Sequence, residues 1–284
     1  MENQEKTAAN LLFCVNRKVL GQMSVCLRSL LRSGGYRHYE VYVLHSDLDE
    51  SISRAMERDF REGVTFHFIP VPEGLFADFP ETGRYPKQIY YRLAAPLLLP
   101  KELDRILYLD VDMVVINPLT ELYEMDFGGN YYAGCTHTRE FLTRLNQARL
   151  QSEKAVAYIN TGVLLMDLNA LREVIRLEDI SAYVREHEKA LILPDQDILT
   201  ALYGDRIKLV DSLRWNLSDR VLAFYNGAHP KEKRDVNWVR ENTSIVHYCG
   251  RNKPWKDNYF GQLDVFWREA EDRLREGAGL CADR

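Results

Sequence analysis

The sequence predicts an α/β fold in which helices flank a β-sheet whose first strands are parallel. Apolar strand patterns alternate with helix patterns over the first 71 residues, which is typical of parallel strands joined by right-handed crossovers. A fourth strand pattern, Arg105 to Leu109, leads directly into two carboxylates. In the second half strand patterns predominate, so the organisation changes along the chain.

The front half is interpreted from apolar spacing and from the residues that interrupt it. Gly34-Gly35 ends the first helix pattern, and the segment from Pro72 to Pro86, with three prolines and two glycines, is a loop. The third helix pattern stops before Pro100. The expected strands are Leu11–Val15, Glu40–His45, Thr65–Val71 and Arg105–Leu109, and the expected helices are Leu20–Leu31, Asp49–Arg61 and Gln88–Leu99.

The second half is expected to add strands and a closing helix to the same domain. No internal repeat and no low-complexity linker divides the chain, so we expect one domain over residues 1–284. The expected strands are Tyr131–Cys135, Tyr158–Leu168, Arg206–Val210 and Ser244–Tyr248, and the expected helices are Asp195–Tyr203 and Phe260–Arg275.

The composition is that of an ordinary enzyme and argues against a general nucleic-acid-binding protein. The 284 residues are 46% hydrophobic and 28% charged, with a formal net charge of -5. A nucleic-acid binder would usually present a basic face. We therefore expect no nucleic-acid partner, although a local basic pocket for a phosphorylated ligand stays open.

Cysteine usage and the first residues predict a cytoplasmic protein. The five cysteines are scattered, odd in number and never spaced as Cys-x-x-Cys, a pattern of reduced thiols. Residues 1–10 are polar and lack the apolar core of a signal peptide. No apolar stretch approaches the ~20 residues that span a bilayer, so we expect at most peripheral membrane contact.

The acidic triplet Asp110-Val111-Asp112 is the first candidate for chemistry. It follows an apolar strand, and ligands of open α/β sheets gather at the carboxyl ends of strands. On a regular strand both carboxylates would face the same side. Carboxylate oxygens suit Mg²⁺ or Mn²⁺, which also bind phosphate oxygens. The alternative is a solvated turn after a strand, where aspartate is common.

A second motif surrounds His247 near the end of the chain. An imidazole can complete a metal site begun by carboxylates. Gly250 allows a close approach of the backbone to a ligand, and Lys253 supplies a point charge suited to phosphate. The alternative is a strand-end histidine followed by a loop with surface charges.

Two further motifs offer polar side chains at the ends of predicted elements. Asp195 and Gln196 could form directional hydrogen bonds to sugar hydroxyls, although an aspartate after Pro194 also fits a helix N-terminus. Asn160-Thr161-Gly162 interrupts an apolar run, and from composition alone it is better interpreted as a turn before a strand.

In this order, the motifs resemble those of glycosyltransferase family 8. That family includes bacterial lipooligosaccharide galactosyltransferases, glucosyltransferases related to general stress protein A, and glycogenin. The similarity extends from Leu11 to about Trp267. It rests on the segments Tyr91-Arg92-Leu93, Leu98-Leu99-Pro100, Leu107-Tyr108-Leu109-Asp110-Val111-Asp112, Asn160-Thr161-Gly162-Val163-Leu164-Leu165, Asp195-Gln196-Asp197, His247-Tyr248-Cys249-Gly250 and Lys253-Pro254-Trp255.

The resemblance implies a GT-A fold, a Rossmann-like mixed sheet flanked by helices. It implies a retaining transfer of glucose or galactose from a UDP-hexose donor to a saccharide or glycolipid acceptor. Residues of about 10–125 would form the nucleotide-binding half and about 126–258 the acceptor-side half, followed by a C-terminal helix in 259–284. Mn²⁺, or Mg²⁺ in its place, would be held on the diphosphate by Asp110, Asp112 and His247.

The resemblance also implies roles for the residues that contact the donor. Gly250 and Lys253 would contact phosphate oxygens, and Gln196 and Asp195 would be the catalytic residues. Because an amide is a poor nucleophile, our hypothesis is that Gln196 steadies an oxocarbenium-like state while UDP leaves and the acceptor attacks from one face. The full set of implied donor-binding residues is Asn16, Arg92, Val111, Asn160, Thr161, Asp195, Gln196, Gly250 and Lys253.

The chain departs from the family pattern in two places. Many relatives have an acidic residue and then Asn-Tyr after the first strand, whereas this chain has Asn16-Arg17-Lys18-Val19. Asn16 could still bond a base or ribose, and we interpret Arg17 and Lys18 as solvated charges. His137 falls where some relatives place an aspartate that contacts the acceptor, so the acceptor cannot be copied from a relative.

Two rival functions remain open at the level of sequence. A nucleotide-sugar binding protein without turnover is supported by the altered loop after the first strand. A metal-dependent phosphodiesterase would use the same carboxylates, but it would normally need a second cluster of acidic or histidine ligands. The sequence shows no such second cluster.

Overall fold

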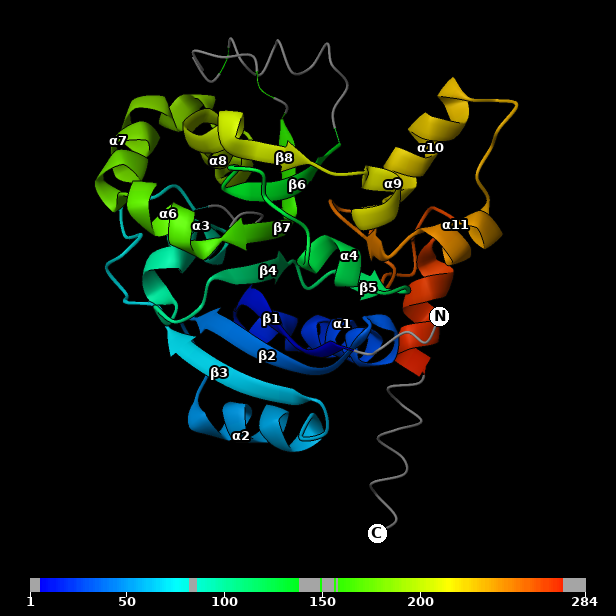
Figure 1. Ribbon diagram of the computed structural model, residues 1–284, viewed down its shortest axis with the longest axis horizontal. Coiled ribbons are helices and arrows are strands. Elements are labelled where there is room, and N and C mark those ends of the chain that lie inside the picture. The colour runs from blue at the N-terminus through cyan, green and yellow to red at the C-terminus, as the bar shows by residue number, and fades with distance from the viewer. Residues whose placement is uncertain (1–5, 82–85, 138–148, 150–155, 157, 273–284) are drawn as a thin grey trace.

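A large mixed sheet forms the centre of the computed structural model, which describes residues 6–81, 86–137, 149, 156 and 158–272 (Figure 1). The strand order is β3-β2-β1-β4-β7-β6-β8. The seven strands are β1 (Lys6–Val15), β2 (Tyr36–His45), β3 (Val64–Pro70), β4 (Arg105–Leu109), β6 (Tyr132–Thr136), β7 (Ile159–Asp167) and β8 (Ile207–Leu209).

The pairing of the strands explains why the sheet is mixed. Strands β3, β2, β1 and β4 are parallel, as the alternation of strand and helix patterns predicts. Strand β7 then runs antiparallel to both of its neighbours, β4 and β6. Strand β8 pairs with β6 in the parallel direction at the far edge. The predicted α/β class with a mixed sheet is confirmed.

Each face of the sheet packs against its own helices because strand residues alternate between the two faces. In β1, Leu11 and Phe13 join the side chains of α1 (Leu20–Ser33) and α2 (Glu50–Asp59). Leu12, between them, joins the opposite core with α3 (Gln88–Leu98), α6 (Leu168–Val174), α7 (Leu177–His187) and α8 (Pro194–Tyr203). The sheet therefore separates two hydrophobic cores, one on each face.

A small second sheet packs against the end of the chain. It pairs β5 (Met113–Val115) with β9 (Ile245–His247) in the antiparallel direction. Val114 and Val246 share a third core with Trp267, which lies on a helix at 264–272. This pairing brings two segments about 130 residues apart next to each other, and it matters for the site.

The remaining helices are short and several begin at a side chain that caps them. Ser218 and Asp235 accept backbone N–H bonds at the starts of α10 and α11, as residues of their types commonly do. These helices are α4 (Thr120–Tyr123), α9 (Ser212–Trp215), α10 (Asp219–Ala228) and α11 (Val236–Asn242), with 3₁₀ turns η1 (Arg17–Val19), η2 (Glu188–Ala190) and η3 (Gly204–Arg206).

Every predicted strand and helix is present in the described residues, with ends that differ by a few residues, but one local prediction is wrong. Asn160-Thr161-Gly162 lies inside β7 rather than in a turn before it. Asp110-Val111-Asp112 follows β4 at its predicted end, Leu109, and forms a bend between β4 and β5. The bend is needed because β5 leaves the large sheet to pair with β9.

Two predictions about the environment of the chain can be compared with the described residues. None of their helices is both long enough and apolar enough to cross a bilayer. Cys14, Cys26, Cys135 and Cys249 are free thiols, as the scattered spacing predicts; Cys281 and the end of the predicted closing helix, 273–275, lie outside the described residues.

Candidate functional site

All twelve residues predicted for the site line one cavity of about 560 Å³, here called the larger cavity. It opens at the carboxyl ends of β1 and β4. Val15, the last residue of β1, and Asp110, the first residue after β4, both line it. The twelve residues are Asn16, Arg92, Asp110, Val111, Asp112, Asn160, Thr161, Asp195, Gln196, His247, Gly250 and Lys253.

Two carboxylates and an imidazole meet on the wall of the larger cavity. One ligand atom from each of Asp110, Asp112 and His247 lies within 4.8 Å of the others. His247 Nε2 is 3.7 Å from Asp110 Oδ2 and 3.3 Å from Asp112 Oδ1. The bend after β4 turns both carboxylates to this point, and the pairing of Met113 with His247 delivers the imidazole.

A glycine makes room for this group. Gly162 lies in β7, and a Cβ atom at this position would fall 2.8 Å from Asp110 Oδ2 and against the ring of His247. The carbonyl of Gly162 accepts a hydrogen bond from the backbone N–H of Asp110 (2.8 Å), so the backbone is tied to the cluster and cannot easily withdraw. The absence of a side chain at 162 is therefore a steric requirement of the cluster.

A chain of amides fixes which nitrogen of His247 faces the carboxylates. The backbone N–H of Gly162 donates to Asn160 Oδ1 (3.2 Å), so this atom must be the oxygen. Asn216 Nδ2 donates to the same oxygen (2.9 Å), which turns Asn216 Oδ1 toward His247 Nδ1 (2.8 Å). Nδ1 must therefore carry a hydrogen, and Nε2 is left to face Asp110 and Asp112.

These three side chains fit a divalent cation. Two carboxylate oxygens and one imidazole nitrogen suit Mn²⁺ or Mg²⁺, and a second residue that orients the histidine is typical of metal sites. Lys253 Nζ donates to Asp112 Oδ2 and to the carbonyl of Tyr248 (2.8 Å). Although burial opposes it, the neighbouring His247 and Lys253 hold the pKa of Asp112 well below its usual range.

Arg92 is buried in α3 and joins the carboxylates on two sides of the larger cavity. Its Nη2 lies 3.1 Å from Asp110 Oδ1, and its Nη1 lies 3.2 Å from Asp195 Oδ2. Nη1 also donates to the carbonyl of Thr161 (2.9 Å), and Nε donates to that of Ile89 (3.1 Å). Most of its donors are thus engaged by the protein, which fixes both carboxylates in place.

The start of α8 presents two different side chains to the larger cavity. Asp195 Oδ2 accepts a hydrogen bond from Thr161 Oγ1 (2.6 Å), and burial raises the pKa of Asp195 although Arg92 opposes the rise. Asp195 does not cap the helix through its side chain. Gln196 Oε1 accepts from Asn160 Nδ2 (3.3 Å), so the amide chain described above extends to this residue.

Asp197, the third residue of the motif, has a structural role. It is fully buried, and Arg149 binds both of its oxygens, at 2.9 and 2.6 Å. Its Oδ2 also accepts the backbone N–H groups of Ile192 and Leu193, and Tyr158 donates to Oδ1. It thus ties the loop before α8 to the helix.

The loop after β1 combines a capping side chain with exposed charges. Asn16 Oδ1 accepts the backbone N–H of Lys18 (3.1 Å), so this side chain caps η1 while lining the larger cavity. Arg17 and Lys18 are exposed, as expected of solvated charges. Arg17 also forms ion pairs with Asp47 and Asp49, which join the loop to the segment after β2.

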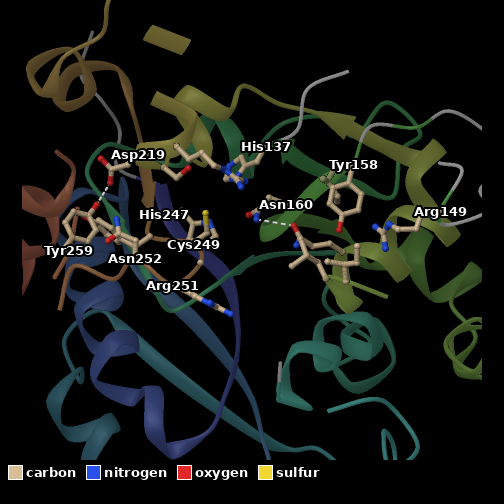
Figure 2. A pocket seen from close by; sticks show the side chains of 18 residues that line it. His137, Arg149, Tyr158, Asn160, Asp219, His247, Cys249, Arg251, Asn252 and Tyr259 are labelled. Carbon is tan, nitrogen blue, oxygen red and sulfur yellow. Dashed lines mark hydrogen bonds between the residues drawn. The ribbon is translucent and has the colours of Figure 1, made fainter. Parts of the chain in front are cut away.

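A second cavity of about 510 Å³, here called the smaller cavity, adjoins the larger one (Figure 2). Figure 2 shows Asn160, His247 and Cys249 at its centre, and the hydrogen bond drawn from Asn160 is the one to Gln196. The two cavities share a wall, which consists of Asn160, Leu193, Gln196, His247, Cys249 and Gly250. A group placed against Gln196 is therefore accessible from both sides.

Two residues that shape the site, Asn216 and Tyr108, are not marked by any pattern in the sequence. Asn216 belongs to no motif, and it is 31 residues away in the sequence from His247, which it contacts. Tyr108 Oη donates to Asp110 Oδ1 (2.5 Å). Because Tyr108 lies in the apolar strand β4, its sequence position predicts only a core residue. His137, singled out for its position in the chain, does line the smaller cavity.

The chain is similar in sequence to known proteins of one family. The model of the family described as "Glycosyl transferase family 8" matches residues 10–259. General stress protein A of Bacillus subtilis is 28% identical over 244 residues, covering 84% of this chain and 83% of that protein. A lipopolysaccharide 1,2-glucosyltransferase of Escherichia coli is 21% identical over 258 residues, covering 89% of this chain and 75% of that protein.

The fold is shared with a solved glycosyltransferase. The crystal structure of the galactosyltransferase LgtC, in complex with donor and acceptor sugar analogues, superposes with a TM-score of 0.77 at 24% identity, covering 93% of this chain and 96% of that one. The likeness confirms the expected GT-A fold. With a family match over most of its length, the chain belongs to glycosyl transferase family 8.

Proposed function

We propose that the protein is a retaining hexosyltransferase that moves glucose or galactose from a UDP-hexose to a saccharide or glycolipid acceptor and depends on Mn²⁺. The observation that carries the proposal is the meeting of Asp110, Asp112 and His247 in a cavity that also holds Lys253. Two carboxylates, an imidazole and an ammonium are a donor set for a metal-bound diphosphate. Relatives named as glucosyltransferases support the reaction class.

The residues around the diphosphate would hold and neutralise the leaving group. A divalent ion held by Asp110, Asp112 and His247 supplies Lewis-acid stabilisation of the charge on the departing UDP. Lys253, whose ammonium now contacts Asp112, is within reach of the same charge. Gly250 has a φ of 91° and open space at its Cβ position, so its backbone N–H can approach a phosphate closely.

The sugar would sit against the wall that the two cavities share. Gln196 lies on this wall with its oxygen bonded to Asn160, a position from which it can steady positive charge on the reacting carbon. Asp195 is turned to Arg92 and Thr161 instead, and would orient sugar hydroxyls. The larger cavity would belong to the nucleotide-binding half, about 10–125, and the smaller one to the acceptor-side half, about 126–258.

Release of UDP from UDP-glucose and UDP-galactose tests the proposal. With Mn²⁺ the protein should release UDP, and Asp112→Asn should slow the release at least about 100-fold because a metal ligand is lost. Asp78→Asn removes the same charge at an exposed residue that lines neither cavity, and it should release UDP at the wild-type rate.

The same measurements distinguish a binding protein from an enzyme. The altered loop at Asn16 is the feature that favours binding without turnover. A rise in the unfolding temperature with UDP-glucose and Mn²⁺ would show binding. If binding is seen but no donor and acceptor pair ever yields UDP, the chain is a nucleotide-sugar binding protein and the proposed transfer is wrong.

A further inference from the structure

The smaller cavity carries two arginines that are not neutralised by any described residue. Arg220 lies in the first turn of α10 and Arg251 in the loop after β9, and both are exposed and line this cavity. Within the described ranges neither forms an ion pair or a side-chain hydrogen bond. Arg149, on the same cavity, differs because Asp197 binds it with both oxygens.

The other titratable groups of the smaller cavity do not cancel this charge. Asp219 is the carboxylate on its wall, and it accepts hydrogen bonds from Tyr259 Oη and from the backbone N–H of Gln262 (2.8 Å). His137 is neutral, since burial and the neighbouring His247 lower its pKa to about 3. Two cations and one engaged carboxylate therefore face the space that a ligand would fill.

These arginines are separate from the cation assigned to the donor diphosphate. Lys253 lines the larger cavity and not the smaller one, whereas Arg220 and Arg251 line the smaller cavity and not the larger one. Figure 2 shows Arg251 at the lower side of the cavity and His137 at the upper side, with Cys249 between them. The positive charge thus lies on the acceptor side of the shared wall.

We propose that the acceptor bound in the smaller cavity carries an anionic group, a phosphate or a carboxylate, that is recognised by Arg220 and Arg251. The inference rests on the proposed function, because it takes the smaller cavity as the acceptor site. Guanidinium groups match the planar oxygens of phosphate and carboxylate and bind them with paired hydrogen bonds. Hydroxyl groups of a neutral saccharide can accept hydrogen bonds from guanidinium groups, but they do not neutralise the positive charge of these two arginines.

Binding of small saccharides to the complex with UDP and Mn²⁺ tests the inference, since UDP then blocks the diphosphate position. The probes are methyl glucoside, glucuronic acid and glucose 6-phosphate, measured by calorimetry or by ligand-observed NMR. We expect the anionic probes to bind at least about tenfold more tightly than the neutral one, with a preference that weakens as salt screens the charges. The stronger of the two anions identifies the natural group as phosphate or carboxylate.

Variants assign the preference to the two arginines. Arg220→Gln and Arg251→Gln should each weaken binding of the anionic probes about tenfold and leave methyl glucoside unchanged. Arg185→Gln makes the same change at an exposed position of α7 outside both cavities and should keep the wild-type preference.

The outcomes separate this inference from the proposed function. If UDP with Mn²⁺ binds and UDP-sugars are hydrolysed, but the anionic probes bind no better than methyl glucoside, the inference is overturned while the transferase stands. Retention of the preference in the double variant Arg220→Gln and Arg251→Gln would overturn it as well. If UDP does not bind or no donor is hydrolysed, the proposed function has failed first.

Discussion

Replacing Asn216 by leucine should weaken the metal site even though Asn216 is not a metal ligand. Its side chain is fully buried, and its Oδ1 accepts from His247 Nδ1 at 2.8 Å while its Nδ2 donates to Asn160 Oδ1 at 2.9 Å. Leucine fills similar space but offers no acceptor. The hydrogen on Nδ1 would then lose its partner, and the imidazole would be free to place a hydrogen on Nε2 instead.

The magnitude follows from these contacts. Loss of a group that orients a metal-binding histidine typically costs about 10- to 100-fold in metal affinity, or about 1.4–2.7 kcal/mol. A buried N–H without a partner costs about 1–3 kcal/mol of folding free energy, so the unfolding temperature should fall as well. Asn160 Oδ1 keeps the bond from the backbone of Gly162, so the loss is concentrated at His247.

A matched variant isolates the contact with His247. Asn216→Asp keeps an acceptor for Nδ1 but, like leucine, removes the donor to Asn160. Titration with Mn²⁺ in the presence of UDP, with free Mn²⁺ followed by electron paramagnetic resonance, should show weak binding for the leucine variant and near wild-type binding for the aspartate variant. Equal affinity in both variants, or wild-type affinity in Asn216→Leu, would refute the reasoning.

Three further changes test other parts of the site. Gly162→Ala should weaken Mn²⁺ binding at least about tenfold, because the new Cβ collides with His247; unchanged titration with Mn²⁺ would contradict this. His137→Gln should reduce the loss of stability in acid: the pKa of about 3 lies below the usual 6.5, so the unfolded chain binds more protons between these values and stability falls as pH falls, by about 2 kcal/mol at pH 5. Denaturant unfolding at pH 7 and pH 5 measures the loss of unfolding free energy in each protein. An equal loss in the wild type and in His137→Gln would contradict the prediction. Asp197→Asn should destabilise the protein by about 3–5 kcal/mol because Arg149 loses a bidentate partner, and a thermal unfolding curve like that of the wild type would exclude the structural role.

The elements of the fold were predictable because their signals are local. Apolar spacing, helix-ending glycines and prolines act within a few residues of where they occur, and the predicted strands and helices are found where these signals lie. Asn160-Thr161-Gly162 was misjudged because its composition is that of a turn. It lies in β7 because Asn160 pairs with Cys135 of β6 and the carbonyl of Gly162 accepts the backbone N–H of Asp110, and these distant contacts decided its conformation against that local preference.

The candidate site was predictable only in part. The place of Asp110 at the end of an apolar strand marked it, and the motif with Gly250 and Lys253 marked His247. No local pattern connects the two residues, so the resemblance to a family was needed to join them in one site. Both carboxylates do face the same point, but a bend places them there rather than a regular strand, since β5 changes sheets. Arg220 carries no signal in the sequence beyond its charge, because only the packing of α10 makes it part of a cavity wall.

The sequence by itself determined the class of fold, the order of the elements and the carboxylates of Asp110 and Asp112, since these depend on the periodicity and chemistry of neighbouring residues. Only the tertiary structure decided that His247 faces them through Nε2, that Arg92 joins Asp110 to Asp195, and that Arg220 and Arg251 line the smaller cavity without an ion pair to any described residue. These contacts join residues that are 18 to 103 positions apart. The pairing of strands sets such contacts, and no local pattern encodes them.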